Sequence, residues 1–521
     1  MRAGARHLAD LCRSVAEIPS SIGVTDISLD SRTVVEGGLF LACAGRRTHG
    51  LSGLSEALSR GANAVLWEPA QGVVAPSIPA GTYAQPIEKL SSVASYIADQ
   101  FFDQPSEILR VAGVTGTNGK TTTTWLLAQA LSHCASPAAY IGTLGVGMAP
   151  DAVIPSEYTT ADAVSVQRQL SVVREAGVQY VAMEVSSHAL DQHRVAGVRF
   201  RVVAFTNLTR DHLDYHGTME AYGAAKAHLF DMPRLEAGVI NVDDAFGAEL
   251  ARRHATRLSL TLIACSAAGA AVIDDIRSRV PRTRSLVASN IKALQNGLSF
   301  IIEYREVGAE PAMRSVIFQL IGEFNVENVL VTLGLLRALG VAFNTALLAL
   351  GKCSAPPGRM EALTAPGKAL AIVDYAHTPD ALTRSLRAAR AHCRGKLHLV
   401  FGCGGDRDPG KRPMMAGVAA AMADGIVITD DNPRSESPVL IAADIVAGFP
   451  KGIRATVIHD RAEAIRHALV GAREGDVVLV AGKGHERYQI VGAERRPFSD
   501  RQIIQSAYRQ STDGIPDASA R

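Results

Sequence analysis

The stretch Leu109-Arg-Val-Ala-Gly-Val-Thr-Gly-Thr-Asn-Gly-Lys-Thr-Thr122 decides how this chain folds. It opens as an apolar run typical of a buried strand, passes through the Gly-rich segment 113–119, and leads into Thr121–Ser132, whose pattern predicts a helix. A strand that enters a Gly-rich turn and then a helix is the order of a nucleotide-binding α/β domain. Backbone N–H groups and the helix dipole then converge on one point, which suits phosphate.

The end of this stretch predicts a site for ATP or GTP. Lys120 is placed to reach the terminal phosphates, and the Thr121 hydroxyl to ligate Mg²⁺. The general P-loop spacing is not strictly met, because Val114 stands where that pattern has its first glycine. The Lys-Thr-Thr run and the flanking elements nevertheless favour a nucleotide site over a fortuitous turn. Such a loop alone fits motors, switches and kinases equally well.

Three blocks of α/β pattern follow one another, and we expect one domain in each: residues 1–108, 109–350 and 351–521. The second block continues with the buried parallel strands Tyr180–Val185 and Val202–Thr206. After the breaker cluster Ala355-Pro-Pro-Gly358, strands and helices alternate again, which predicts a second doubly wound sheet. Its expected strands are Ala369–Asp374, Leu397–Phe401, Gly425–Thr429 and Asp476–Ala481.

The bulk composition indicates an ordinary globular protein. Hydrophobic residues make up 47% of the 521 positions and charged residues 20%, which excludes disorder as the main state. The net charge of +2 gives no reason to expect a nucleic-acid partner. Seven scattered cysteines, none spaced as C-x-x-C, favour a reducing cytoplasm over disulfides or a zinc site. We expect no signal peptide and no membrane segment, because no run approaches the roughly 20 apolar residues of a span.

Polar groups gather after the strands of the second block, at the edge where α/β sheets present ligands. Glu184 ends one strand, the polar segment 205–217 contains His212 and His216, and Lys226 follows in a helical run of small residues. Each has an ordinary alternative when taken singly: a capping glutamate, surface histidines and a solvated helix lysine.

Taken together, several strings resemble the Mur ligases in order and spacing over nearly the whole chain. They are TGTNGKTT (115–122), EVSSHAL (184–190), FTNLTRDHLDYHG (205–217), AAK (224–226), YAHTPD (375–380) and GKGHE (482–486). Leu29-Asp-Ser-Arg32 is similar to the subgroup that adds the third peptide residue to a UDP-linked muramoyl dipeptide. The resemblance implies three α/β domains: a small UDP-substrate domain, a central P-loop ATPase domain with a parallel sheet, and a C-terminal Rossmann-like, doubly wound domain.

The resemblance also implies roles around ATP. Catalysis would fall to Lys120, Lys226, Glu184 and His212. Magnesium would be held by Thr121, Glu184, His212 and Lys226, the last carried as a carbamate. The residues expected to contact ATP are Gly116, Thr117, Asn118, Gly119, Lys120, Thr121, Thr122, Asn325, Arg359 and Asp374.

Two further sets are implied for the other substrates. Those matching the UDP-muramoyl peptide site are Leu29, Ser31, Arg46, Arg47, Thr48, Tyr158, Thr159, Thr160, Ser186, Gln192 and Arg194. Tyr158 departs from the family, which often has Asn there. Those matching the amino-acid site are Arg407, Asp431, Asn432, Pro433, Arg434, Gly482 and Glu486.

The expected reaction uses ATP and Mg²⁺ to join meso-diaminopimelate to UDP-MurNAc-L-Ala-D-Glu through an acyl phosphate, in a monomeric enzyme. Asp431-Asn-Pro-Arg434 accompanies family members that take diaminopimelate, and a guanidinium suits its extra carboxylate. A lysine-adding relative is one alternative. A folylpolyglutamate synthetase-like ligase is another, but gives no reason for the UDP-type N-terminal block. A nucleotide switch or motor leaves residues 375–380 and 482–486 without a role.

Overall fold

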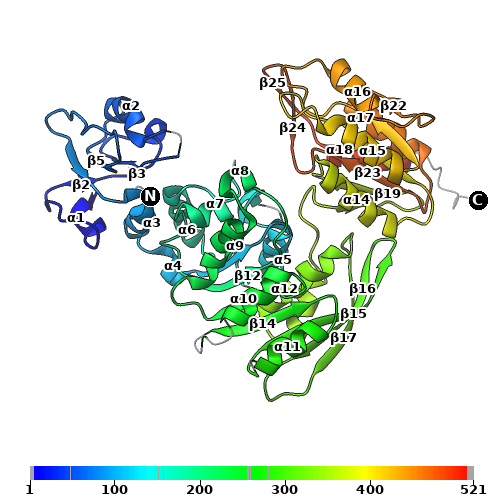
Figure 1. Cartoon of the computed structure of the whole chain (residues 1–521), viewed down its shortest axis with the longest axis horizontal. Helices are drawn as coiled ribbons and strands as arrows, with labels where there is room; N and C mark the ends of the chain where they lie inside the picture. The colour runs from blue at the N-terminus through cyan, green and yellow to red at the C-terminus, as the bar shows by residue number, and fades with distance from the viewer. Residues whose placement is uncertain are drawn as a thin grey trace, which may run out of the picture.

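The computed structural model describes residues 5–512 except 47, 135, 151, 157, 255–256, 258–259 and 280. Within them the chain forms three main sheets, one in each of three successive parts (Figure 1). The N-terminal sheet contains β3 (Ile27–Ser28), β4 (Leu39–Ala42), β5 (Ala64–Trp67) and β6 (Tyr83–Pro86), all parallel. Helix α2 (Leu54–Ser59) lies between β4 and β5 in the sequence, and helix α3 (Leu90–Phe101) follows β6.

The central sheet has 11 strands, with β7 (Arg110–Thr115) between β11 (Tyr180–Glu184) and β12 (Phe200–Phe205). The parallel strands also include β8 (Ala138–Gly142), β13 (Ala237–Asn241), β14 (Thr261–Ser266) and β15 (Arg284–Leu294). Their carboxyl ends therefore meet at one edge, where the predicted polar groups follow β11 and β12.

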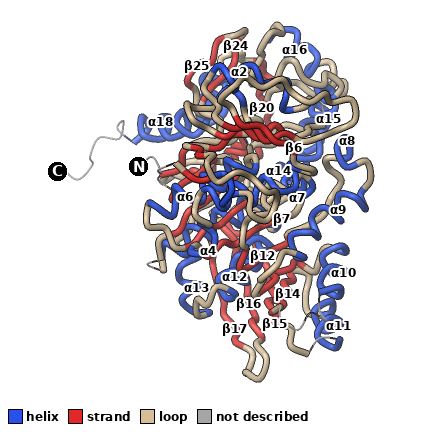
Figure 2. The backbone as a smooth tube through the Cα atoms, turned by 90° about the vertical axis from the view of Figure 1, so that its left-hand side faces the viewer, coloured by secondary structure: helices blue, strands red, loops and turns tan. Residues whose placement is uncertain are grey.

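Antiparallel strands extend this sheet at both sides, which the sequence analysis did not predict. One side carries β9 (Gly145–Met148) and β10 (Ala152–Ile154), and the other β16 (Gly297–Arg305) and β17 (Ala312–Phe318). Figure 2 shows β15, β16 and β17 reaching beyond the helices at the lower end of the molecule. Buried positions alternate with half-buried ones along most of β16, as expected for a strand with one covered face.

Helix α5 (Lys120–His133) forms directly after the Gly-rich loop although four consecutive threonines open it. Threonine is a poor helix former, but residues 122–131 are buried. The Thr124 hydroxyl donates to the Lys120 carbonyl at 2.7 Å, so its polar group is satisfied inside the helix. Helix α12 (Phe324–Ala338) packs into the same core. Tertiary burial therefore overrides the local propensity of α5.

The C-terminal sheet has the order β18-β19-β23-β20-β21-β22, in which only β18 (Glu361–Leu363) is antiparallel. The parallel strands are β19 (Leu370–Asp374), β20 (Leu397–Phe401), β21 (Gly425–Ile428), β22 (Thr456–Val457) and β23 (Val477–Ala481). Helices α14 (Pro379–Ala391), α15 (Lys411–Met422) and α16 (Pro438–Val446) share one core with this sheet. Helices α17 (Arg461–Gly471) and α18 (Asp500–Thr512) share a second. Two cores, one on each face, confirm the predicted doubly wound architecture.

Among the described residues, no helix is long and apolar enough to cross a membrane.

The close packing of β7 generates a stability prediction. A Cβ at Gly113 would lie 2.8 Å from two ring atoms of Phe200, which is buried. Gly113→Val should therefore lower the free energy of unfolding by about 1–3 kcal/mol, measured by urea denaturation. The matched control is Gly417→Ala in α15, where a new Cβ meets nothing within 4 Å. Gly417→Ala should raise the free energy of unfolding by up to about 1 kcal/mol. Equal stabilities of the two variants would contradict the packing argument.

Candidate active site

The Gly-rich loop is held against the end of β12. The Thr117 N–H donates to the Asn207 carbonyl at 2.7 Å, and the Asn118 N–H to Asn207 Oδ1 at 2.9 Å. Gly116 has φ +143°, and a Cβ there would lie 1.9 Å from Thr206 Oγ1. Only glycine fits this close approach between the two strand ends.

Lys120 lies across the loop. Its Nζ donates to the carbonyls of Gly116 and Thr117, each at 2.9 Å. Desolvation by burial lowers the pKa of Lys120, while the charges of Glu184 and Asp211 raise it. An ammonium that bonds to the loop carbonyls is placed beside any phosphate that the loop amides bind.

Glu184 is fully buried at the carboxyl end of β11. Its Oε2 accepts from the Thr121 hydroxyl at 3.0 Å, and its Oε1 from the Thr143 N–H at 2.9 Å and the Tyr140 hydroxyl. Thr143 and Tyr140 are not among the residues predicted from the sequence. Glu184 is not a helix cap: Ser186 caps α7 (Ser187–Asp191), the helix after its strand, and in α5 Glu184 accepts from the Thr121 side chain rather than from a backbone N–H.

Lys226 lies in α9 (Met219–Ala227), and its side chain is 1% exposed, so it is not a solvated helix lysine. Its Nζ donates to the Gly116 carbonyl at 2.7 Å and lies 4.3 Å from the Tyr222 ring centroid. Burial, followed by the charge of Lys120, lowers the pKa of Lys226 well below its ordinary value. The structure thus brings the two predicted lysines to one carbonyl oxygen.

His212 belongs to an aromatic cluster beside this site. Its side chain is 47% exposed, and its ring centroid lies 4.9 Å from that of His188 and 6.0 Å from that of Tyr222. Burial and then the neighbouring charges of His212 and His216 lower the pKa of His188 to about 4. His188 therefore stays neutral at physiological pH.

A magnesium ion would find few protein ligands here. No group of three or more His, Cys, Asp and Glu side chains suited to a metal occurs among the described residues. Mg²⁺ usually takes one or two carboxylates and completes its shell with substrate phosphates and water. The Thr121 hydroxyl and Glu184 carboxylate, 3.0 Å apart, fit that requirement.

The residues predicted for the muramoyl peptide form one network with Glu184. The Thr160 hydroxyl donates to the Glu184 carbonyl at 2.9 Å and accepts from the Ser186 N–H at 3.1 Å. Arg194 donates to the Thr160 carbonyl at 3.0 Å and, through Nε and NH2, to Gln192 Oε1.

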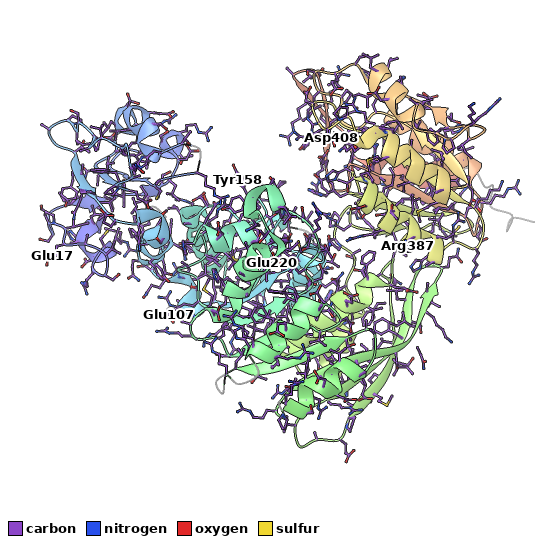
Figure 3. The ribbon with its side chains drawn as sticks, in the orientation of Figure 1. Glu17, Glu107, Tyr158, Glu220, Arg387 and Asp408 are labelled. Carbon is purple, nitrogen blue, oxygen red and sulfur yellow. The ribbon has the colours of Figure 1, made fainter. Side chains whose placement is uncertain are left out.

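Two threonines and a tyrosine adjoin this network. Thr159 and Thr143 share a hydroxyl–hydroxyl bond of 3.0 Å, which links the substrate set to Glu184. Tyr158 is 61% exposed; it is labelled in Figure 3, on the central part of the molecule. A ring this exposed makes little contact with the network that its neighbour Thr159 joins.

The residues of the N-terminal part that were predicted to bind the UDP substrate have different surroundings. The Arg46 guanidinium lies 3.8 Å from the Tyr215 ring centroid and donates to the Tyr215 carbonyl at 3.2 Å, which joins the N-terminal part to the central one. Leu29 lines a cavity of about 370 Å³ that also includes Arg168 of the central part. Ser31 donates to Glu56 at 2.8 Å, and the Thr48 carbonyl accepts from the Gly45 N–H. Arg47 lies outside the described residues.

Asn325 does not face the nucleotide loop directly. Its Oδ1 accepts from Asn328 Nδ2 at 2.7 Å, and its own Nδ2 donates to the Ile321 carbonyl. Asn328 is the side chain at the loop, because its Oδ1 would lie 2.3 Å from a Cβ at Gly119. The spacing Asn325-Val-Glu-Asn328, one helical turn, was the signal that could have identified it.

Two other ATP candidates come from the C-terminal part. Arg359 lies over Tyr375, with 4.8 Å from Cζ to the ring centroid. Asp374 accepts from the N–H groups of Met360 and Ala376 and from the Ser385 hydroxyl. Its carboxylate is therefore engaged in holding the turns after β19 and before β18.

The amino-acid candidates come together at the carboxyl ends of β20, β21 and β23. Asn432 is buried and donates to Glu486 Oε2 at 2.8 Å, and buried Asp431 and Pro433 flank it. A Cβ at Gly482, which has φ +116°, would lie 2.3 Å from Asp431 Oδ2.

The two arginines of this set differ in surroundings. Arg434, with φ +53°, is half-buried and donates to the Gly405 carbonyl at 2.7 Å, whereas Arg407 is exposed. Asp408, next to Arg407, is labelled in Figure 3 on the C-terminal part. Figure 1 shows that this part, in yellow to red, stands away from the blue N-terminal part.

Comparison with known proteins agrees with this arrangement. Residues 114–336 match the Mur ligase middle domain and residues 358–484 the Mur ligase, glutamate ligase domain. Two curated proteins are named UDP-N-acetylmuramoyl-L-alanyl-D-glutamate--2,6-diaminopimelate ligase. One, from Ectopseudomonas mendocina (strain ymp), is 44% identical, with 92% of this chain and 94% of that protein covered. The other, from Alkalilimnicola ehrlichii, is 46% identical, with 93% and 94% covered.

A solved structure of a ligase with the same name has a TM-score of 0.71 and 32% identity, covering 98% of this chain and 99% of that one. Likeness of this extent in both sequence and fold, together with the two matching domains, shows that the chain belongs to the Mur ligase family.

Proposed function

We propose that this chain is the ATP-dependent ligase that joins meso-diaminopimelate to the D-Glu γ-carboxyl of UDP-MurNAc-L-Ala-D-Glu during peptidoglycan precursor synthesis. The observation that carries the proposal is the C-terminal loop Asp431–Arg434, bonded to Glu486 in a chain that is 44–46% identical to ligases of that name. An arginine beside a buried acidic group suits an amino acid that carries both an ammonium and a carboxylate at its far end.

The first step activates a poor acyl donor. The D-Glu carboxylate oxygen attacks the γ-phosphorus of ATP, ADP leaves, and an acyl phosphate forms. The loop amides and Lys120 hold the phosphates, while Thr160, Arg194 and their partners hold the peptide beside Glu184. Mg²⁺, when bound by Thr121 and Glu184, offsets charge on the phosphoryl oxygens.

The second step forms the amide bond. The neutral amine of the amino acid attacks the acyl carbon, the phosphate leaves with its bonding electron pair, and the nitrogen releases one proton to water. The site on the C-terminal part must present that amine to the phosphate end of the central part. Burial is the main cause of the lowered pKa of Lys120, and the charge of Arg359 also lowers it. Arg359 comes from the C-terminal part, so this effect supports a C-terminal part that lies close to the nucleotide loop.

We also propose that Lys226 works as a carbamate. Its lowered pKa favours the neutral amine, which attacks CO₂ and releases one proton to give an N-carboxylate. The change places a negative charge beside the Lys120 ammonium, at the Gly116 carbonyl that both lysines contact. That carbamate, with His212 nearby, would complete a second magnesium site.

The remaining proposals concern the whole molecule. We assign the UDP substrate to residues 1–108, ATP to 109–350 and the amino acid to 351–521. We place the enzyme in the cytoplasm as a monomer without nucleic-acid or membrane partners. The scattered, unpaired cysteines among the described residues support the reducing compartment.

A ligation assay tests the proposed function. With ATP and UDP-MurNAc-L-Ala-D-Glu, the purified chain should release ADP and phosphate only when an amino acid is present. We expect kcat/KM for L-lysine to be about 10⁴ lower than for meso-diaminopimelate. Lysine has no carboxylate at its far end, so it leaves the Arg434 guanidinium desolvated and without a carboxylate partner. Comparable values would refute the amino-acid assignment and leave the ligase class standing.

The role of Arg434 can be separated from a structural one. Arg434→Ala should raise KM for diaminopimelate about 10- to 100-fold, the loss expected for a hydrogen bond to a charged group. KM for ATP should change little. Arg434→Lys keeps the charge but cannot form two parallel hydrogen bonds. Its KM for diaminopimelate should lie between those of the wild type and Arg434→Ala. A fall in melting temperature with unchanged KM would instead assign Arg434 to its bond with Gly405.

Loss of Lys226 should abolish ligation without unfolding the protein. Lys226→Ala is expected to keep its circular dichroism spectrum and to regain part of its activity with added acetate or formate, which replace the carbamate's charge. In the wild type, ¹³C-bicarbonate should give a carbamate resonance that the variant lacks. Full activity of Lys226→Ala, or no such resonance, would contradict the carbamate.

A further inference from the structure

One buried lysine of the amino-acid site has no role among those assigned above. Lys483 follows β23 between Gly482 and Glu486, and its side chain is 0% exposed. Its Nζ donates to Asn432 Oδ1 at 3.0 Å and to Glu486 Oε2 at 2.9 Å. A lysine is buried this completely only when its ammonium is paired.

These bonds join two loops that come from different strands. Asn432 lies after β21 and Glu486 after β23, and β20 separates those strands in the sheet. Asn432 Nδ2 also donates to Glu486 Oε2 at 2.8 Å, and its Oδ1 accepts from the Ile490 N–H at 2.9 Å. Lys483, Asn432 and Glu486 therefore close a triangle in which each side chain fixes the other two.

The triangle leaves one oxygen of Glu486 free. Both bonds from Lys483 and Asn432 end on Oε2, and no hydrogen bond within the described part of the chain reaches Oε1. The Glu486 side chain is 17% exposed, and Oε1 is not among the fully buried polar atoms that lack a partner, so a ligand can reach it. A fixed carboxylate oxygen without a protein partner is a strong acceptor for an ammonium group.

The surrounding charges match the same ligand. Arg461 is buried against Asp500 through two bonds of 2.7 and 2.8 Å, and its charge, with that of Lys483, acts on buried Asp431. Asp431 and Glu486 offer carboxylates to the ammonium of a ligand, while Arg434, from the same loop as Asp431 and Asn432, offers a cation to its carboxylate. Lys483 is held inside this site by its two bonds, where its charge offsets part of the negative charge of Glu486 and Asp431.

We propose that Lys483 is the positioning residue of the amino-acid site: it holds Glu486 and Asn432 so that the second oxygen of Glu486 receives the ammonium of the incoming amino acid. The inference rests on the proposed function for the identity of that amino acid. Lys483 itself does not touch the substrate and acts through Glu486.

Steady-state kinetics of the full chain test this role. Lys483→Met keeps the length and removes the charge and both bonds. It should raise KM for meso-diaminopimelate about 10- to 100-fold, with KM for ATP and for the UDP substrate within about threefold of wild type. Lys483→Arg should recover part of the loss. The matched control is Arg390→Met, which breaks the ion pair with Asp424 at the opposite edge of the sheet and should leave all three KM values unchanged.

A double-mutant cycle shows whether Lys483 works through Glu486. In the background of Glu486→Gln, Lys483→Met should add less than about threefold to KM for diaminopimelate, since its effect is already lost. Independent effects that multiply would overturn the inference. So would an equal rise of all three KM values together with a lower melting temperature, which would mark Lys483 as merely structural.

A crystal structure of Lys483→Met separates this inference from the proposed function. The Glu486 and Asn432 side chains should leave their present positions while β21 and β23 stay in place. Unchanged side chains would overturn the inference whatever the enzyme ligates. If the wild type does not use diaminopimelate but the side chains move, the proposed function fails and the positioning role stands.

Discussion

The carbonyl oxygen of Gly116 is the point on which the nucleotide site depends. It accepts from Lys120 at 2.9 Å and from Lys226 at 2.7 Å, so two lysine nitrogens from different elements meet at one acceptor. The approach requires glycine, because any Cβ would collide with Thr206. Two like charges this close would repel each other, and burial, followed by the charge of Lys120, lowers the pKa of Lys226 well below its ordinary value. The Lys120 ammonium suits a nearby anion, whether a phosphate of ATP or a carboxylate carried by Lys226.

The amino-acid site holds groups of both signs. Asp431 and Glu486 lie on the loops that also carry Lys483 and Arg434, and Lys483 is fully buried. A ligand that carries both an ammonium and a carboxylate therefore finds a partner for each. A ligase must bring an anionic nucleotide and an amino acid together, and two separate sites allow each to be bound by groups that suit it.

Parallel strands explain why both sites lie where they do. Glu184 and the Gly-rich loop follow β11 and β7, and Asn432 and Glu486 follow β21 and β23, each pair at the carboxyl edge of its own sheet. Rigid sheets fix the side chains within each site. Arg359 and Tyr375 stand after the linker from the central part, and the charge of Arg359 acts on Lys120. Arg359 of the C-terminal part therefore lies within electrostatic range of the nucleotide loop.

The sequence by itself determined the elements and the chemistry that stays local to them. The apolar run before Gly113 and the Gly-rich turn predicted β7, the loop and α5, and alternating strands and helices predicted the second doubly wound sheet. These follow from short-range periodicity, which one chain segment carries alone. The antiparallel strands β16 and β17 were not predicted, because their pairing is a relation between segments.

Tertiary structure alone decided which side chains meet. The local pattern alone predicts a solvated helix lysine at Lys226. Folding brings Lys226 against Gly116, which lies 110 positions earlier in the sequence. Asn328, one helical turn after the predicted Asn325, lies at the Gly-rich loop and donates to the Asn325 side chain, a contact that only folding shows. The string 482–486 by itself predicts no role for Lys483, since its partner Asn432 lies 51 positions earlier. Burial, charge balance and contacts between distant segments are properties of the assembled sheets, and no local pattern encodes them.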